Sequence, residues 1–241
     1  MHCPAVRASP GAKNDTISTR QIGLSVEFSL KLAFSAVAIV LTLVTFIPYI
    51  RAILSGAIKP HVFTWIIWGI TTVIVFFAQL EAEGGMGAWP IGVSGVITCF
   101  IALLAFLKRA DISISKVDWL FFLAALASLP IWFFTSDPLW AVVALTGVDL
   151  LGFGPTIRKA YHFPHDENLP FFAFFVARNS FAILALEHYS VTTVLFPAAI
   201  IGACLVLLLI IKTRRQLVWA KGLDPAGPRI GTKAQTQAWS D

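Results

Sequence analysis

Two ionisable residues, Asp149 and Arg178, lie inside long apolar stretches of this 241-residue sequence. Asp149 precedes Arg158 by nine residues, and Arg178 follows Pro170 by eight. At about 1.5 Å per residue, both would lie roughly 12–14 Å from the basic ends of their helices. A charge at such a depth is costly unless it is paired or hydrated. The pair predicts a solute or proton site, or an ion pair that only fixes helix packing.

Polar and aromatic residues at helical spacing extend this candidate site. Trp65, Trp68, Thr71 and Thr72 fall on one face of a predicted helix, and Trp65 alone also fits an interfacial position. Asn179 adds an amide beside Arg178. One side of the site would then be aromatic and hydroxyl-lined and the other charged, which suits a zwitterionic or anionic ligand. The predicted binding residues are Asp149, Arg178, Asn179, Trp65, Trp68, Thr71 and Thr72.

Composition places these residues in a membrane protein. Hydrophobic residues make up 57% of the chain and charged residues 13%, with a mean hydropathy of +0.79. Soluble domains carry roughly 25% charge. We therefore expect no nucleic-acid partner. The sequence holds no nucleophile, phosphate-loop or zinc-protease motif, so we expect no enzyme and no cofactor. His162 and His165 flank Pro164, which disfavours a helical metal site, and Cys99 and Cys204 are predicted to be small packing residues.

Seven apolar segments are long enough to be predicted as membrane-spanning helices. They are residues 30–50, 63–80, 89–107, 119–134, 139–157, 170–186 and 191–211. The predicted organisation is a polar N-terminal tail (1–29), a first three-helix repeat (30–110), a linker helix (111–136), a second three-helix repeat (137–212) and a polar C-terminal tail (213–241). The fold class is an all-α membrane protein.

Lysine and arginine distribution predicts the orientation. Thirteen of these residues fall in the loops after the first, third and fifth segments and in the C-terminal tail, whereas the other three loops hold none. The N-terminal tail and the start of the first segment hold four. We expect an external N-terminus and a cytoplasmic C-terminus, in the plasma membrane.

The sequence repeats itself at an offset of 107 residues. Phe46 matches Phe153, and the same offset matches Pro90 with Pro197 and Gly95 with Gly202. It also places Thr71, Thr72, Trp65 and Trp68 against Arg178, Asn179, Phe172 and Phe175. Three segments, one connector and three segments keep both repeats in the same orientation, which is a parallel repeat.

Each repeat opens with a segment that ends in Pro-x-Ile-Arg, at 48–51 and 155–158, and continues through a short loop into another proline. With the three-one-three layout, residues 30–212 resemble the PQ-loop and SWEET/SemiSWEET superfamily of small transporters. Sugar-transporting members carry an Asn on the third helix of each unit. The third and seventh segments here contain none, which disfavours a sugar. The resemblance also implies bending at the prolines Pro48, Pro60, Pro155 and Pro170.

Two function classes follow from these observations. The first is a transporter or facilitator that moves a small polar solute by alternating access between the two units, with Asp149 as a candidate for proton coupling. The second is a non-transporting receptor or scaffold on the same fold. The expected partners are a small polar solute and the lipid bilayer, and a homo-oligomer is compatible with the sequence.

Overall fold

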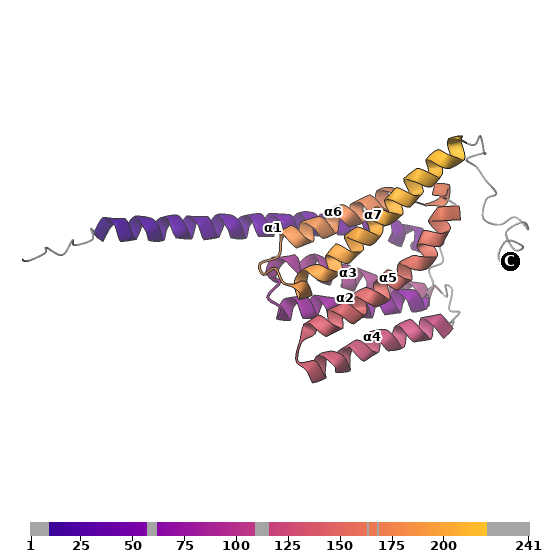
Figure 1. Cartoon of the computed structure of the whole chain (residues 1–241), viewed down its shortest axis with the longest axis horizontal. Helices are drawn as coiled ribbons and strands as arrows, with labels where there is room; N and C mark the ends of the chain where they lie inside the picture. Colours follow the sequence, from indigo (N-terminus) through magenta and orange to yellow (C-terminus); the bar gives the residue numbers. More distant parts are fainter. Residues whose placement is uncertain (1–9, 57–61, 109–115, 163, 168, 221–241) are drawn as a thin grey trace, which may run out of the picture.

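The computed structural model of this protein describes residues 10–56, 62–108, 116–162, 164–167 and 169–220. Within these ranges the chain is all-helical and has no strand, so the predicted all-α class is confirmed (Figure 1). The 3₁₀ helices are η1 (Gly85–Gly87) and η2 (Pro164–Asp166). The α-helices are α1 (Pro10–Leu54), α2 (Val62–Glu81), α3 (Trp89–Leu107), α4 (Lys116–Thr135), α5 (Pro138–His162), α6 (Leu169–Leu184) and α7 (Val191–Ala220).

Four of the described helical segments are long and apolar enough to cross a membrane. They are Ser25–Leu54, Val62–Glu81, Gly85–Leu107 and Val191–Leu217. Shorter apolar stretches occupy Phe122–Thr135, Pro138–Gly154 and Leu169–Leu184. In hydrocarbon, backbone groups must be bonded within the protein, and a helix satisfies them within the segment. The chain is therefore a multi-pass membrane protein.

Helix α1 begins much earlier than the sequence predicts. The helix starts at Pro10, a residue that is well tolerated in a first helical turn, and so includes much of the polar segment that precedes the predicted membrane-spanning segment 30–50. Lys31 and Glu27 form an ion pair of 3.1 Å one turn apart, and the Ser29 hydroxyl donates to the Ser25 carbonyl at 2.8 Å. Such local pairs let polar residues continue a helix. Helix α7 likewise continues beyond residue 211, to Ala220.

We call α1, α2 and α3 the first helix group and α5, α6 and α7 the second. In the first, α3 packs against both α1 and α2, and in the second, α7 packs against both α5 and α6. The two groups meet where α1 packs on α6 and where α2 packs on α5. Helix α4 packs mainly on α5 and also contacts α2, at the edge of the body (Figure 1).

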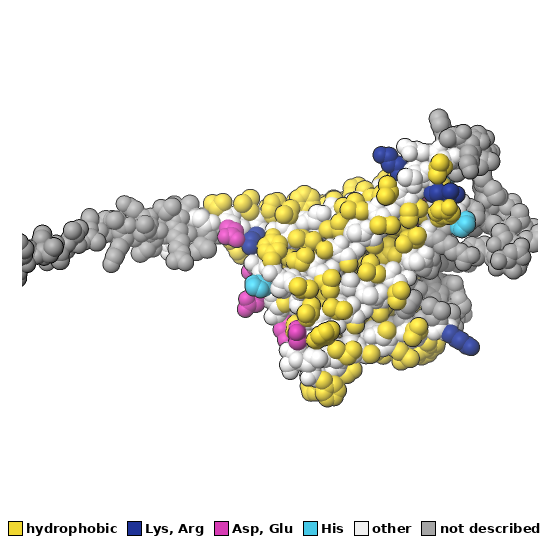
Figure 2. Space-filling view, viewed as in Figure 1, with side chains coloured by type: hydrophobic (Ala, Val, Ile, Leu, Met, Phe, Trp, Pro, Cys, Tyr) yellow, Lys and Arg dark blue, Asp and Glu magenta, His cyan; other side chains and the backbone are white. Residues whose placement is uncertain are grey.

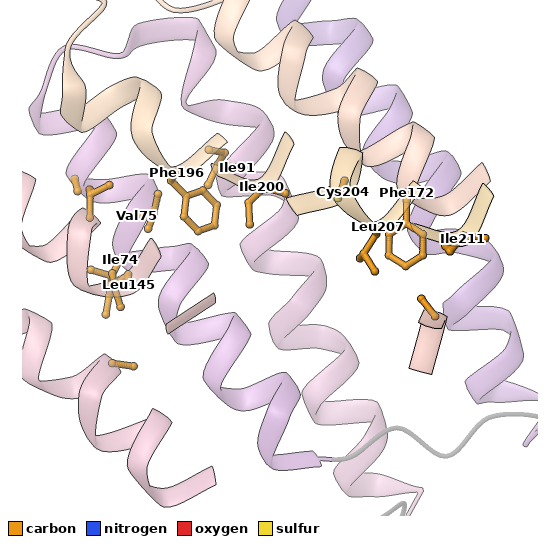
Figure 3. Close-up of a cluster of buried hydrophobic side chains, with 14 residues drawn as sticks. Ile74, Val75, Ile91, Leu145, Phe172, Phe196, Ile200, Cys204, Leu207 and Ile211 are labelled. Atoms are coloured by element: carbon orange, nitrogen blue, oxygen red, sulfur yellow. The ribbon is translucent and has the colours of Figure 1, made fainter. Parts of the chain in front are cut away.

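One face of α7 forms the spine of the largest core. Phe196, Ile200, Cys204, Leu207 and Ile211 recur every three or four residues and are all buried. Figure 3 shows these side chains in a row, with Phe172 of α6 beside Leu207 and Ile211. This spacing places them on one helical stripe, which explains why α7 lies against both α5 and α6.

Charged side chains gather at the two ends of the helical body. Figure 2 shows Asp and Glu at one end and most Lys and Arg at the other, with an apolar belt between them. Glu81, Glu83 and Glu187 are exposed at the first end, which we call the acidic end. Arg51 and Lys108 are exposed at the ends of α1 and α3. Charge segregation of this kind suits a slab of lipid around the apolar belt.

The prolines occupy different places in their helices. Pro48 and Pro155 lie inside α1 and α5. Pro170 is the second residue of α6, where proline breaks no intrahelical bond, and Pro60 lies outside the described residues. Pro197 is the seventh residue of α7, which begins at Val191. It therefore leaves the Thr193 carbonyl without its helical donor.

Candidate functional site

A cavity of about 220 Å³ lies between the two groups of helices and is lined by residues of α1, α2, α3, α5, α6 and α7. Six of the seven predicted binding residues line it, and the seventh, Thr71, contacts one of them. The lining residues are Phe46, Trp65, Trp68, Thr72, Ser94, Thr98, Asp149, Gly152, Phe153, Thr156, Phe171, Phe172, Phe175, Arg178, Asn179, Phe196, Ile200 and Cys204.

Asp149 reaches this cavity from α5 and is 9% exposed. The Thr71 hydroxyl of α2 lies 3.3 Å from Asp149 Oδ1 and 3.1 Å from the Trp68 carbonyl oxygen. Because a hydroxyl has one proton, Thr71 can donate it to only one of these acceptors at a time. The Asp149 carboxyl group is thus held across the boundary between the two helix groups by a single, long contact.

Arg178 enters the cavity from α6 and is only 3% exposed. Its Nη1 donates to Ser94 Oγ of α3 at 3.2 Å, and its guanidinium carbon lies 5.2 Å from the centre of the Phe175 ring. The Nε atom is buried without a hydrogen-bond partner. A buried donor without a hydrogen-bond partner costs stability. A ligand in the cavity that accepted a hydrogen bond from Nε would remove that cost, so such a donor is expected where a polar ligand binds.

Asp149 and Arg178 do not form the ion pair that one reading of the sequence predicts. The salt bridge found among the described residues joins Lys31 to Glu27, and none joins these two side chains. Each instead bonds to a hydroxyl of the first helix group, Asp149 to Thr71 and Arg178 to Ser94. The cavity therefore holds an acidic and a basic group that are not paired with each other.

Asn179 completes the polar side of the cavity. It is fully buried, and its Nδ2 donates to the Phe175 carbonyl one turn earlier at 2.8 Å. Its Oδ1 has no partner. Among the described residues, each of these two neighbours thus has one buried polar atom without a partner, the donor Arg178 Nε and the acceptor Asn179 Oδ1.

Aromatic rings form most of the remaining wall. Trp65 is 8% exposed and packs edge-on against Phe46 and Trp68, with ring centres 6.4 and 5.4 Å apart. An interfacial position does not fit such burial. Phe46 also meets Phe175 of the other helix group, at 5.9 Å. The Trp68 indole nitrogen lies beside Gly152, where a Cβ would make an ordinary contact with it at 3.6 Å.

Residues related by the offset of 107 meet in the cavity. Four such pairs line it on both sides. They are Phe46 with Phe153, Trp65 with Phe172, Trp68 with Phe175, and Thr72 with Asn179. The position equivalent to Arg178 is Thr71, so the second group carries charge where the first carries a hydroxyl.

The acidic end of the body ties the two helix groups together, and we call these contacts the acidic-end latch. The Glu187 amide donates to the Gly84 carbonyl at 3.2 Å, and its Oε1 accepts from the Met86 amide at 3.1 Å. Gln79 Nε2 donates to the Thr193 carbonyl at 2.6 Å, the group that Pro197 leaves without a helical donor.

Glycine permits the close approach in this latch. Gly85 has a φ of +56°, and a Cβ there would overlap the Glu187 carboxylate. A Cβ at Gly87 would lie 2.7 Å from the Leu186 nitrogen. The chain from α2 to α3 therefore lies directly on the end of α6.

Sequence reasoning missed several residues of this arrangement. Ser94 and Thr98 are four apart on α3 and line the cavity together, a spacing that could have placed them on one face with the site. Gln79 is a buried amide in an apolar helix, which is itself a signal for a specific partner. Cys204, predicted as a packing residue, belongs to the core and also lines the cavity.

Comparison with known proteins adds no relative to this description, because no family model matches the chain and no curated protein or solved structure matches it significantly.

Proposed function

We propose that this protein transports a small polar solute across the membrane by alternating access at the central cavity. The observation that carries the proposal is a cavity between two helix groups that holds buried, unpartnered polar atoms of Arg178 and Asn179. A site lined from both groups changes its exposure when one group rocks against the other. Asp149, which is not ion-paired, is the candidate for coupling the movement to protons.

The proposed architecture is seven spans in two parallel three-helix units, α1–α3 and α5–α7, with α4 as the linker. Its support is the matching order of packing, in which the third helix of each unit lies between the other two. The contacts between units also match, because α1 on α6 is equivalent to α5 on α2. This arrangement is the one that the resemblance to the PQ-loop and SWEET superfamily implies.

Orientation can be tested with reporters on the full-length chain. We propose an external N-terminus, with the acidic end outside and Asp241 in the cytoplasm, in the plasma membrane. A reporter fused after Asp241 should read cytoplasmic, and one inserted at Gly84–Gly85 should read external. If both reporters were found on the same side of the membrane, the chain would have one membrane span fewer than proposed, and the parallel repeat would be ruled out.

Uptake into proteoliposomes tests transport itself. A mixture of labelled sugars, polyols, amino acids and carboxylates should yield at least one solute that accumulates above protein-free vesicles. Trp68→Ala should lower this uptake at least about tenfold, because truncating an aromatic residue that anchors a ligand can cost about 2 kcal/mol or more, and Trp68 is a partly buried ring of the cavity wall.

Trp140→Ala is the matched control, since Trp140 is a half-exposed tryptophan of α5 outside the cavity wall. Uptake by this variant should stay near that of the unmodified protein. Equal losses in both variants would contradict the proposed site. Solute binding without any uptake would favour the second function class, a receptor on the same fold.

A further inference from the structure

We propose that the solute is a small zwitterion of the amino-acid kind, with its carboxylate at Arg178 and its ammonium group toward Asp149. This inference rests on the proposed function, because it names the chemical class of solute for the same cavity. It goes further in assigning one end of the ligand to each charged side chain.

The carboxylate end follows from the guanidinium geometry. Arginine binds carboxylates through two parallel N–H donors on one edge of its planar group. Nη1 of Arg178 is engaged by Ser94, whereas Nε is buried and has no partner. The edge that carries Nε is therefore the one whose donor a ligand carboxylate would satisfy. Packing on Phe175 and the bond to Ser94 hold the guanidinium in place before a ligand arrives.

The ammonium end follows from the acceptors. Asp149 has no salt bridge within the described part of the chain, and one hydroxyl contact of 3.3 Å is its hydrogen bond there. Asn179 Oδ1 is a second acceptor without a partner. The rings of Trp65, Trp68 and Phe46 can add cation–π attraction for a positive group.

Net charge separates a zwitterion from other solutes. An anion would satisfy Arg178 but would bring a negative charge near Asp149, and a cation would do the reverse. A zwitterion matches both groups and leaves the buried site with no added charge. A sugar needs many hydroxyl partners, whereas more than half of the lining residues are apolar.

Cavity size limits the ligand. Pockets for drug-sized ligands hold roughly 300–1,000 Å³, so a cavity of about 220 Å³ suits a smaller metabolite. Amino acids with small or medium side chains fall in this range.

The test compares ligands of the same shape and different charge. Binding to the purified full-length protein is measured by calorimetry for leucine, for 3-methylbutylamine, which lacks the carboxylate, and for 4-methylpentanoate, which lacks the ammonium group. Glycine, alanine, proline, glutamine and glucose complete the set. At least one zwitterion should bind about tenfold or more tightly than its single-charge analogues, since each analogue loses a hydrogen bond to a charged group.

Two variants assign the ends of the ligand. Arg178→Gln should abolish the advantage of the zwitterion over the amine, and Asp149→Asn should abolish its advantage over the carboxylate. Opposite changes in preference cannot arise from misfolding, which would weaken all ligands together. As a readout at the site, the bound zwitterion should slow thiol labelling of Cys204 in a Cys3→Ser/Cys99→Ser background.

Three outcomes would overturn the inference: no zwitterion binding, equal binding of zwitterion and 4-methylpentanoate, or tighter binding of glucose. Equal binding of the carboxylate would mean that a proton, and not an ammonium group, meets Asp149. Zwitterion binding without uptake would uphold this inference and contradict transport. Uptake of a neutral solute without zwitterion binding would uphold transport and contradict this inference.

Discussion

Arg178→Met is expected to abolish most transport while leaving the protein as stable as before, or more stable. Transport should fall between roughly tenfold and hundredfold, because hydrogen bonds to a charged group contribute about 1.5–3 kcal/mol. Stability should not fall in proportion, since Arg178 has no carboxylate partner and its buried Nε is unpartnered. Replacing such a buried charge by an apolar side chain of similar volume is often neutral or stabilising. Uptake and thermal unfolding of the same preparations measure the two effects.

Arg51→Met is the matched control, because Arg51 is an exposed arginine at the end of α1. It should change neither the uptake nor the unfolding temperature appreciably. Ser94→Ala provides a second comparison, since it removes the hydroxyl that Nη1 contacts and keeps the charge. That variant should lose about 1 kcal/mol of stability and part of the uptake.

A purely structural role for Arg178 would give a different pattern. Arg178→Met would then lower the unfolding temperature, and the double variant Asp149→Leu/Arg178→Met would recover both stability and uptake. Recovered uptake in the double variant would end the site hypothesis, because no charged group would remain in the cavity wall.

Much of the cavity could be predicted because its chemistry is unusual in an apolar sequence. Asp149 and Arg178 stand out as charges in apolar helices, and helical spacing places Trp65 and Trp68 on one face. The offset of 107 then relates both tryptophans to Phe172 and Phe175, and all four rings line the cavity. Charged residues are rare in apolar helices, and the aromatic residues follow a regular helical spacing. Both features are visible in the sequence itself, so they can be recognised without a structure.

The hydrogen-bond partners of Asp149 and Arg178 could not be predicted, because they depend on how helices that are distant in sequence are rotated against one another. Asp149 and Arg178 were placed at matching depths, which suggested a direct pair. The packing turns each toward the first helix group instead, where the Thr71 hydroxyl donates to Asp149 and the Ser94 hydroxyl accepts from Arg178. Depth follows from counting residues, whereas rotation follows from the whole set of contacts.

The ends of the helices also could not be predicted from the hydropathy of the sequence. The start of α1 was placed at residue 30 because hydropathy rises there, but hydropathy marks where lipid begins and not where a helix begins. Residues such as Glu27 and Lys31 continue the helix through local pairing.

Gln79→Leu is expected to destabilise the protein by itself, and a second replacement, Pro197→Ala, is expected to restore most of the lost stability. Gln79→Leu removes the donor to the Thr193 carbonyl, a bond of 2.6 Å that joins α2 to α7. The carbonyl would then be buried without a partner, because Pro197 has no N–H to offer it. Leaving a buried acceptor unsatisfied costs about 1–3 kcal/mol. Gln79 Oε1 is itself buried without a partner among the described residues, so its removal offsets part of this cost, and we expect a modest fall in the unfolding temperature of the variant.

Adding Pro197→Ala to Gln79→Leu should restore most of this stability. The alanine N–H completes the helical bond to Thr193 and satisfies the carbonyl from within α7. Pro197→Ala alone should have a small effect, because Gln79 and the new N–H would share one acceptor. The four proteins form a double-mutant cycle, and a coupling energy near zero would contradict the assigned bond.

The variants of the Gln79–Pro197 cycle also test whether the acidic-end latch controls access to the cavity. The double variant keeps every backbone group satisfied but loses the link between α2 and α7. If that link helps to hold the acidic end closed, a charged thiol reagent applied from that side should label Cys204 faster in the double variant than in the unmodified protein, both in the Cys3→Ser/Cys99→Ser background. Glu187 and Gly84 still join the two groups in this variant, so we expect an increase of severalfold and not a fully open site. Unchanged labelling with restored stability would mean that the Gln79 bond only replaces a missing helical bond, and that closure depends on the Glu187 contacts alone.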